Sequence, residues 1–333
     1  MSRPSEDDLI AQFFAPLAGP GGLGLRDDAA LLAPPPGTEI VATVDGLVAG
    51  VHFFADDPPD SIARKALRVN LSDLAAKGAT PLGFLLTLAL PRDWTSDWLS
   101  QFARGLGEDA RDYACPLLGG DTVSTPGPLT LSVTALGAAP AGRMVPRTGA
   151  RAGDLLYVSG TIGDAALWLP ARRQRLAGGQ DIRSGVLDAI DLAHLKRRYL
   201  LPQPRVRLAP ALLEFASGAM DVSDGLVGDL AKMMRVSGVG AEVDIARIPL
   251  SAAAAEFVLA EPEMLETALT GGDDYEILAS IPPERAAAFE AAARAAGVEV
   301  SQIGVVVEGS APPAFRDARG APMSFRRGSF SHF

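Results

Sequence analysis

Six aspartates of this 333-residue chain occupy positions where a carboxylate could do chemistry. Each lies beside glycines, at the end of an apolar segment or on an apolar helix face, and they are Asp28, Asp45, Asp73, Asp121, Asp221 and Asp224. If these carboxylates converge they repel one another, and hard divalent cations would remove that repulsion. Oxygen-only ligands favour Mg²⁺ over zinc or copper, and Mg²⁺ usually completes its shell with water and substrate phosphates. The set therefore predicts metal-assisted phosphoryl transfer from a nucleotide.

Asp73 is notable because it falls on the apolar side of a predicted helix. At about 100° per residue, Ile62, Leu67 and Leu74 share one sector with it. A carboxylate in that sector needs a counter-charge, since burying an unpaired charge is costly. Two interpretations stay open, namely an internal salt bridge to Lys77 one turn later and a metal ligand.

Glycines precede Asp121. Gly119 and Gly120 would let the backbone approach a ligand and would put Asp121 at the end of a short strand, whereas a tight turn with an Asx cap is the alternative. His52 is a lone histidine, and such a residue is more often structural than functional. The segment 19–24 matches G-x-G-x-x-G, but we discount it because a helix is predicted before it and a strand after it.

The second acidic segment contains Asp221, Ser223 and Asp224. Ser223 or Asp224 can cap the helix that follows, which would explain one acidic residue and leave Asp221 unexplained. A strand, a glycine turn at 159–164 and a helix N-terminus also form a geometry suited to anions, although the chain has no Walker loop.

The elements that must position these residues indicate a first half of α+β type. We expect helices at 6–15, 61–78, 96–113 and 284–296, a helix from 165, a helix ending at 234, and strands at 25–32, 39–45, 82–90, 129–136 and 155–158. The strand 39–45 would place Asp45 at its C-terminal end. Turn residues accumulate near Arg147, so we expect an N-terminal domain of residues 1–146 and a C-terminal domain of residues 147–333.

Composition narrows the functional classes. The chain is 48% hydrophobic and 21% charged, as in ordinary globular proteins. Its net charge of -10 and pI of about 4.9 argue against a nucleic-acid groove and an anionic membrane surface. Cys115 is the single cysteine, so no internal disulfide framework or cysteine zinc cluster is possible. Without a signal peptide or a long apolar run, we expect a soluble, cytoplasmic protein.

Seven motifs, in order along nearly the whole chain, resemble those of the thiamine-monophosphate kinase family. They are Asp27–Leu32, Thr43–Asp45 with His52, Val69–Ala76, Gly119–Thr122, Arg147–Gly149, Asp221–Leu226 and Gly271–Glu276. The resemblance implies the two-domain fold of the aminoimidazole ribonucleotide synthetase superfamily, of mixed α+β and α/β type. In that fold the N-terminal sheet forms a barrel with that of a second copy, and the C-terminal domain is α+β.

The resemblance also implies an activity and the residues that carry it. ATP would transfer its γ-phosphate to thiamine monophosphate, giving thiamine diphosphate, with several Mg²⁺ ions and in a homodimer. Magnesium ligands would be Asp28, Thr43, Val44, Asp45, Asp73, Asp121, Asp221 and Asp224. Asp73, Asp121 and Asp221 would be catalytic. Nucleotide contacts would be Gly120, Asp121, Arg147 and Ser223. Substrate contacts would be His52, Asp273 and Phe330.

Two classes of alternative remain. One is another ATP-dependent member of the same superfamily, although Cys115 lies neither near the N-terminus, as selenophosphate synthetase would require, nor at the C-terminus, as the hydrogenase-maturation member would require. The other is a non-catalytic nucleotide and Mg²⁺ binding module. Arg26 stands where the family usually has glycine, and Asp273 where it commonly has glutamate.

Overall fold

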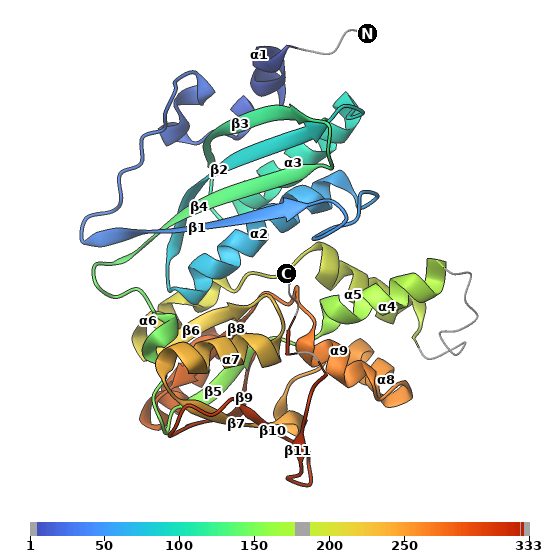
Figure 1. Cartoon of the computed structure of the whole chain (residues 1–333). Coiled ribbons are helices and arrows are strands. Elements are labelled where there is room, and N and C mark those ends of the chain that lie inside the picture. Colours follow the sequence, from blue (N-terminus) through green and yellow to red (C-terminus); the bar gives the residue numbers. More distant parts are fainter. Residues whose placement is uncertain (1–4, 177–186, 327, 330–333) are drawn as a thin grey trace. The chain divides into compact units, whose positions relative to one another are not determined.

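A computed structural model of the protein describes residues 5–176, 187–326 and 328–329 (Figure 1). The chain forms two compact units. The first comprises Met1–Leu74 and Ala79–Met144, and the second comprises Ala75–Gly78 and Val145–Phe333. Among the described residues, no helix combines the length and apolar character that crossing a bilayer requires.

The first unit is built on an open four-stranded sheet in the order β1-β4-β2-β3. Its strands are β1 (Thr38–Val48), β2 (Thr80–Pro91), β3 (Leu117–Thr125) and β4 (Thr130–Pro140). The β1–β4 and β4–β2 pairs are antiparallel, whereas β2 and β3 are parallel. A parallel pair requires a crossover connection, which here contains α3 (Ser96–Asp112). Helix α2 (Pro59–Ala76) connects β1 to β2.

The sequence of β2 explains why the helices cover one face of this sheet. Phe84, Leu86 and Leu88 alternate with more exposed residues and are at most 4% exposed. Leu85, on the opposite face, is 37% exposed. Side chains along a strand point alternately to the two faces, so only one face of the sheet enters the core. Figure 1 shows α2 and α3 running along one side of the strands.

The N-terminal segment is helical in short pieces. It comprises α1 (Glu6–Leu9), a π-helical turn (Ile10–Phe14) and two 3₁₀ segments (Ala15–Leu17 and Pro20–Leu25). The expected strand at 25–32 is wrong, because these residues form the end of a 3₁₀ segment, bends and irregular backbone. The glycine-rich segment 19–24 therefore neither follows a strand nor opens an α-helix, which confirms that it is no dinucleotide fingerprint.

The second unit contains a seven-stranded sheet in the order β11-β10-β7-β9-β5-β8-β6. The strands are β5 (Leu155–Ser159), β6 (Gly218–Val222), β7 (Gly240–Asp244), β8 (Glu276–Ile281), β9 (Val300–Val307), β10 (Ala314–Arg316) and β11 (Pro322–Met323). The helices are α4 (Asp164–Leu176), α5 (Ala189–Leu200), α6 (Ala209–Phe215), α7 (Leu226–Ser237), α8 (Ala252–Ala260), α9 (Met264–Thr270) and α10 (Ala286–Ala295).

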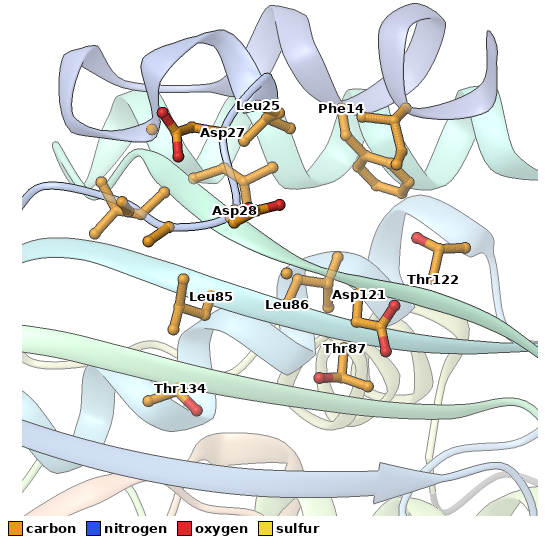
Figure 2. A pocket seen from close by; sticks show the side chains of 18 of the residues that line it. Phe14, Leu25, Asp27, Asp28, Leu85, Leu86, Thr87, Asp121, Thr122 and Thr134 are labelled. Atoms are coloured by element: carbon orange, nitrogen blue, oxygen red, sulfur yellow. The ribbon is translucent and has the colours of Figure 1, made fainter. Parts of the chain in front are cut away.

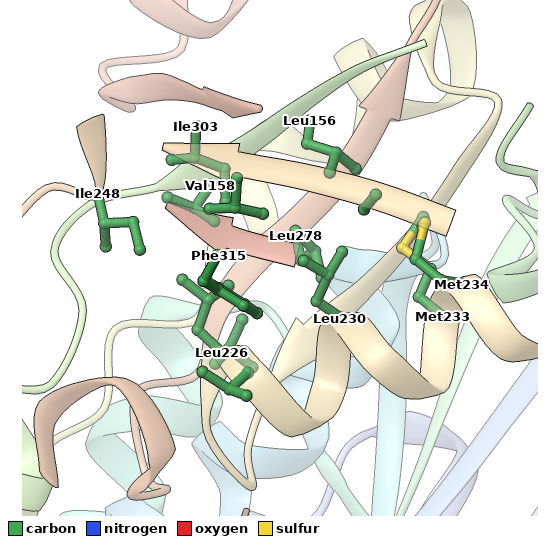
Figure 3. Close-up of a cluster of buried hydrophobic side chains, with 14 of the residues drawn as sticks. Leu156, Val158, Leu226, Leu230, Met233, Met234, Ile248, Leu278, Ile303 and Phe315 are labelled. Atoms are coloured by element: carbon green, nitrogen blue, oxygen red, sulfur yellow. The ribbon is translucent and has the colours of Figure 1, made fainter. Parts of the chain in front are cut away.

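Both faces of this second sheet are covered, and β8 is therefore buried at all six positions. On one face Leu278 packs with residues of β5, β9 and α7 (Figure 3). On the other face Ile277 and Ile281 pack with Leu212 of α6 and Phe289 of α10. The two units thus have the mixed α and β content expected from the sequence. Within the residues that the structure describes, neither sheet closes into a barrel.

Candidate active site

A cavity of about 740 Å³ lies in the first unit between the N-terminal segment and strands β2 and β3 (Figure 2). Figure 2 shows Asp28 above Leu85 and Thr87, with Asp121 on the neighbouring strand. The carboxylates that line the cavity are those of Glu6, Asp27, Asp28 and Asp121. No lysine or arginine is among its lining residues in the described part of the chain. An anionic ligand would therefore need cations in order to enter it.

Gly119 and Gly120 also line the cavity, but their backbone is that of a strand. A Cβ atom on Gly120 would lie 1.9 Å from the carbonyl oxygen of Leu86, so the close approach of β3 to β2 already requires glycine there. The tight turn that the sequence left as an alternative is absent, because β3 continues to Thr125. For the same reason Asp121 lies in the middle of β3 rather than at its end. There it pairs in register with Thr87 of β2.

Asp73 has a partner on β1. Thr43 donates a hydrogen bond from its Oγ1 to Oδ2 of Asp73, while Lys77 donates from Nζ to the carbonyl oxygen of Ala219 at 2.7 Å. These partners differ from the internal salt bridge that the sequence left open. Asp73 is partly buried on α2, between the buried Ser72 and Leu74.

The neighbours of Thr43 on β1 differ in environment. Val44 points to the opposite face of the sheet and is 61% exposed, whereas Asp45 is half-buried. The expected position of Asp45 at a strand end is wrong, because β1 extends to Val48. The cavity lining includes Asp28 and Asp121 but none of Thr43, Val44, Asp45 and Asp73.

His52 takes part in a local backbone contact. Its Nδ1 accepts a hydrogen bond from the backbone N–H of Val48 at 3.0 Å, so Nδ1 carries no proton in this arrangement. Its carbonyl oxygen accepts from Nζ of Lys65 at 3.0 Å. These bonds support the structural interpretation of His52, and its substrate contact stays a prediction.

In the second unit, the acidic turn between β6 and α7 is organised by a residue that the sequence did not single out. Helix α7 begins after Gly225, without a side-chain cap, so capping by Ser223 or Asp224 is wrong. Instead Oδ2 of the buried Asp229 accepts the backbone N–H groups of Ser223 at 3.0 Å and Asp224 at 2.9 Å. Burial raises the pKa of Asp229, and its contacts with Lys232 oppose that rise. Asp221, the penultimate residue of β6, is 5% exposed.

Asp273 lies against this turn. Its backbone N–H donates to the carbonyl oxygen of Ser223 at 2.9 Å, and Tyr275 N–H donates to that of Val222 at 2.8 Å. Asp273 adopts φ 73°, a left-handed conformation that costs a non-glycine residue energy and that recurs at functional sites. The Tyr275 hydroxyl donates to Oδ1 of Asp273 at 3.2 Å. The structure thus brings the Ser223 turn and Asp273 together.

The glycine turn at 159–164 does bind a carboxyl group, but that group belongs to the chain. Gly163 N–H donates to Oδ1 of Asp274 at 2.8 Å. Asp274 is fully buried, and burial raises its pKa well above the usual range despite Gly163 and Arg198. The anion-binding geometry expected from the sequence is therefore already occupied within the fold.

Beside Asp274 lies a buried ion cluster that sequence reasoning missed. Glu276 accepts hydrogen bonds from Arg198 at 2.7 Å, from Arg205 Nε at 2.6 Å and from the Ser159 hydroxyl at 2.6 Å. Asp164, also buried, accepts from Thr161 at 2.6 Å. The partners are up to 117 residues apart in sequence, so no local motif signals them.

Two predicted contact residues, Arg147 and Phe330, remain to be placed. Arg147 is exposed in a 3₁₀ turn (Arg147–Gly149), and its carbonyl oxygen accepts from the Ser237 hydroxyl at 3.3 Å. Phe330 lies outside the described residues. Within the described ranges, no three His, Cys, Asp or Glu residues are grouped closely enough to share a metal ion. Convergence of the six aspartates stays a prediction.

Comparison with known proteins identifies the family of this chain. Family models described as AIR synthase related protein match it, the N-terminal domain at residues 26–139 and the C-terminal domain at residues 151–313. A thiamine-monophosphate kinase of Caulobacter vibrioides is 47% identical over 321 residues, which cover 95% of this chain and 88% of the relative. The chain belongs to the thiamine-monophosphate kinase family.

Solved structures of thiamine-monophosphate kinases agree with that assignment over both units. The enzyme of Stenotrophomonas maltophilia K279a is 38% identical with a TM-score of 0.78, covering 90% of this chain and 91% of that chain. AaThiL complexed with AMPPCP and TMP is 28% identical with a TM-score of 0.76, covering 100% of this chain and 99% of that chain. The fold expected from the motif resemblance, two domains of AIR synthase type, is therefore confirmed.

Proposed function

We propose that this chain transfers the γ-phosphate of ATP to thiamine monophosphate and so forms thiamine diphosphate. One observation carries the proposal: a family member that aligns with all of this chain was solved with AMPPCP, an ATP analogue, and TMP bound together. The two ligands in that protein correspond to the donor and the acceptor of a phosphoryl transfer.

The acceptor chemistry needs no general base from the protein. A phosphate monoester has a second pKa of about 6, so it is largely ionised at neutral pH and already nucleophilic. Direct in-line transfer then requires positioning and neutralisation of the phosphate charge, and no phosphoenzyme. His52 has no role as a base in this scheme, which is compatible with its bond to the Val48 N–H.

The donor atoms fit magnesium as the neutralising ion. The aspartates and Thr43 offer hard oxygen ligands, and the cavity lining contains four carboxylates with no basic residue among those described. Mg²⁺ is commonly held by one or two carboxylates plus phosphates, so a protein cage of three acidic residues is not required. When bound, Mg²⁺ would stabilise the charge on the transferring phosphate. Its proposed ligands are Asp28, Thr43, Val44, Asp45, Asp73, Asp121, Asp221 and Asp224.

We assign further roles within each unit. In the first, Asp73 and Asp121 are the proposed catalytic carboxylates. The hydrogen bond from Thr43 orients Asp73. Gly120 and Asp121 contact the nucleotide. In the second, Asp221 is the third catalytic carboxylate.

The remaining proposed contacts are to nucleotide and substrate. Arg147 and Ser223 contact the nucleotide, while His52, Asp273 and Phe330 contact thiamine monophosphate. For Asp273 the supporting observations are its left-handed backbone and its bonds to Ser223 and Tyr275.

The domain boundary after residue 146, the dimer and a cytoplasmic location also belong to the proposal.

The sheet face opposite α2 and α3 exposes large apolar side chains on three of its four strands. They are Ile40 at 40%, Val44 at 61%, Leu85 at 37% and Val123 at 43%. Strand register places all of them on that face. A second copy covering this face would close the open sheet into a barrel. The cytoplasm supplies the ATP that the reaction consumes.

The first experiment is an assay of ADP release from ATP and Mg²⁺, with and without thiamine monophosphate, with product identification by chromatography. We expect ADP and thiamine diphosphate at equal rates. Asp73→Ala and Asp121→Ala should each lower turnover by about 10²–10³-fold or more, the size of losing one transition-state contact. The exposed Asp97→Ala is the matched control.

Two outcomes would contradict the proposal. ATP binding without thiamine diphosphate formation would favour the non-catalytic module or another superfamily activity. Near-normal turnover of Asp73→Ala at saturating Mg²⁺ would remove Asp73 from the catalytic set.

A further inference from the structure

Three charged side chains form a cluster at the start of α7. Lys232 donates from Nζ to Oδ1 of Asp229 at 2.8 Å, and the same Nζ contacts Oδ2 of Asp224. The Asp229 side chain is 0% exposed, whereas those of Lys232 and Asp224 are 32% and 35% exposed. One ammonium group is therefore shared between a buried carboxylate and a half-exposed one.

The two carboxylates differ in what else holds them. Asp229 is fixed because its second oxygen accepts the backbone N–H groups of Ser223 and Asp224 at 3.0 and 2.9 Å. Asp224 lies on the turn itself, and its contact with Lys232 satisfies one of its oxygens. If Asp224 turned toward another cation, Lys232 would still keep its ion pair with Asp229, which sits three residues before it on the helix.

A divalent cation at Asp224 would meet Lys232 as a competitor. Both positive groups seek the same carboxylate, and two cations within a few ångströms repel each other. Because the pair is partly exposed, that repulsion is moderated by solvent rather than prohibitive. The ammonium would therefore weaken Mg²⁺ binding by a limited factor and would occupy Asp224 when no metal is bound.

We propose that Lys232 is the resident counter-cation of Asp224, which it releases to Mg²⁺, and that it thereby sets the magnesium affinity of this turn. The inference rests on the proposed function, in which Asp224 is a magnesium ligand. Lys232 acts as a positioning residue, through Asp224, and needs no contact with either substrate.

Metal binding to the nucleotide-free, full-length protein tests the proposal directly. Mn²⁺ serves as the probe, its bound fraction is read by electron paramagnetic resonance, and Mg²⁺ displaces it in a competition titration. Lys232→Met should tighten Mn²⁺ and Mg²⁺ binding by about three- to tenfold, the effect of removing one nearby, partly solvated charge. Lys232→Arg, which keeps the charge, should stay within about twofold of the wild type.

Arg235→Met is the matched control because it removes one positive charge from the exposed side of the same helix. At about 0.15 M salt a more distant exposed charge is largely screened, so its titration should follow the wild type. If Lys232→Met does not fold, as judged by its melting curve, Lys232→Gln repeats the measurement with a hydrogen-bond donor retained for Asp229.

The variants distinguish failure of the proposed Lys232 role from failure of Asp224 as a magnesium ligand. If Asp224→Asn weakens Mn²⁺ binding but neither Lys232→Met nor Lys232→Gln tightens it, the counter-cation role of Lys232 is wrong and Asp224 remains a ligand. If Asp224→Asn leaves Mn²⁺ binding unchanged, Asp224 is no ligand and this part of the proposed site is wrong. An equal gain in Arg235→Met would also overturn the proposal, since the effect would then be one of net charge.

Discussion

Asp274 shows at the scale of one residue how the fold handles a buried acid. Its Oδ1 accepts the Gly163 N–H, whereas its Oδ2 has no hydrogen-bond partner among the described residues. Arg198 from α5 lies nearby, but so do the carboxylates of Asp164 on α4 and Glu276 on β8. Burial and these two acids favour the protonated form, because an ionised Asp274 would add a third negative charge to an enclosed space.

This environment predicts a pH dependence of stability. A pKa raised above its unfolded value of about 3.8 means that the native state keeps the proton longer than the unfolded chain. The stabilisation is therefore complete below that value and is lost as pH rises through the native pKa. Asp274→Asn, which is neutral at all pH values, should become more stable relative to wild type as pH rises, by about 1.4 kcal/mol per unit within that window.

Urea unfolding at pH 5 and pH 8 measures this difference. Asp97→Asn, at an exposed carboxyl group, is the control and should show little change between the two conditions. A free-energy difference between Asp274→Asn and wild type that stays constant from pH 5 to pH 8 would show that Asp274 is ionised in the native state as in the unfolded chain, so that its native pKa is not raised into this range.

At the scale of elements, the contact between β2 and β3 positions one of the four carboxylates that line the cavity. Asp121 is carried by β3, and the strand reaches its place because Gly120 has no side chain to meet the backbone of Leu86. The same glycine was predicted to contact a nucleotide. Its structural requirement is independent of any ligand, so the presence of glycine at this position is not by itself a sign of binding.

Gly120→Ala should therefore destabilise the protein even without nucleotide. The added Cβ would lie 1.9 Å from the Leu86 oxygen, so β3 must move, at a cost of about 1–3 kcal/mol or more. Gly119→Ala is the matched control, because its nearest neighbour would be a side-chain carbon of Leu85 at 3.4 Å. Thermal unfolding of the two variants compares them. Equal melting temperatures would contradict this account of the strand contact.

At the scale of the whole molecule, the apolar face of the first sheet predicts self-association. Ile40 and Val123 lie on β1 and β3, the two edge strands of the open sheet, and point to the same face. Exposed apolar side chains collected on one sheet face are typical of an interface. The chain should therefore run in solution at twice its 34.6 kDa mass.

Ile40→Lys and Val123→Lys should each shift the protein toward the monomer, because a lysine cannot be buried unpaired in an apolar interface. Light scattering coupled to size exclusion measures the mass. Val236→Lys, at a 44% exposed position of α7, is the control and should leave the mass unchanged. A monomeric wild type, or dimers that survive both substitutions, would mean that this face is not the interface.

Much of the fold followed from local pattern. The predicted helix at 61–78 corresponds to α2 (Pro59–Ala76), and the predicted strand at 82–90 corresponds to β2 (Thr80–Pro91). In both, apolar residues recur with the period of one buried face. The segment 25–32 misled because its apolar residues resemble those of a strand, yet the segment forms bends and irregular backbone and Leu31 is 71% exposed.

For the candidate site, the types of residue could be predicted from local sequence, whereas their contacts could not. The sequence by itself determined the residue types: oxygen ligands at glycine turns and strands, an acidic chain, and no cysteine or histidine cluster. Only the tertiary structure decided which groups meet, such as Thr43 with Asp73 and Arg205 with Glu276. Periodicity is encoded by neighbours along the chain, whereas an ion pair depends on a distance that packing of remote segments sets.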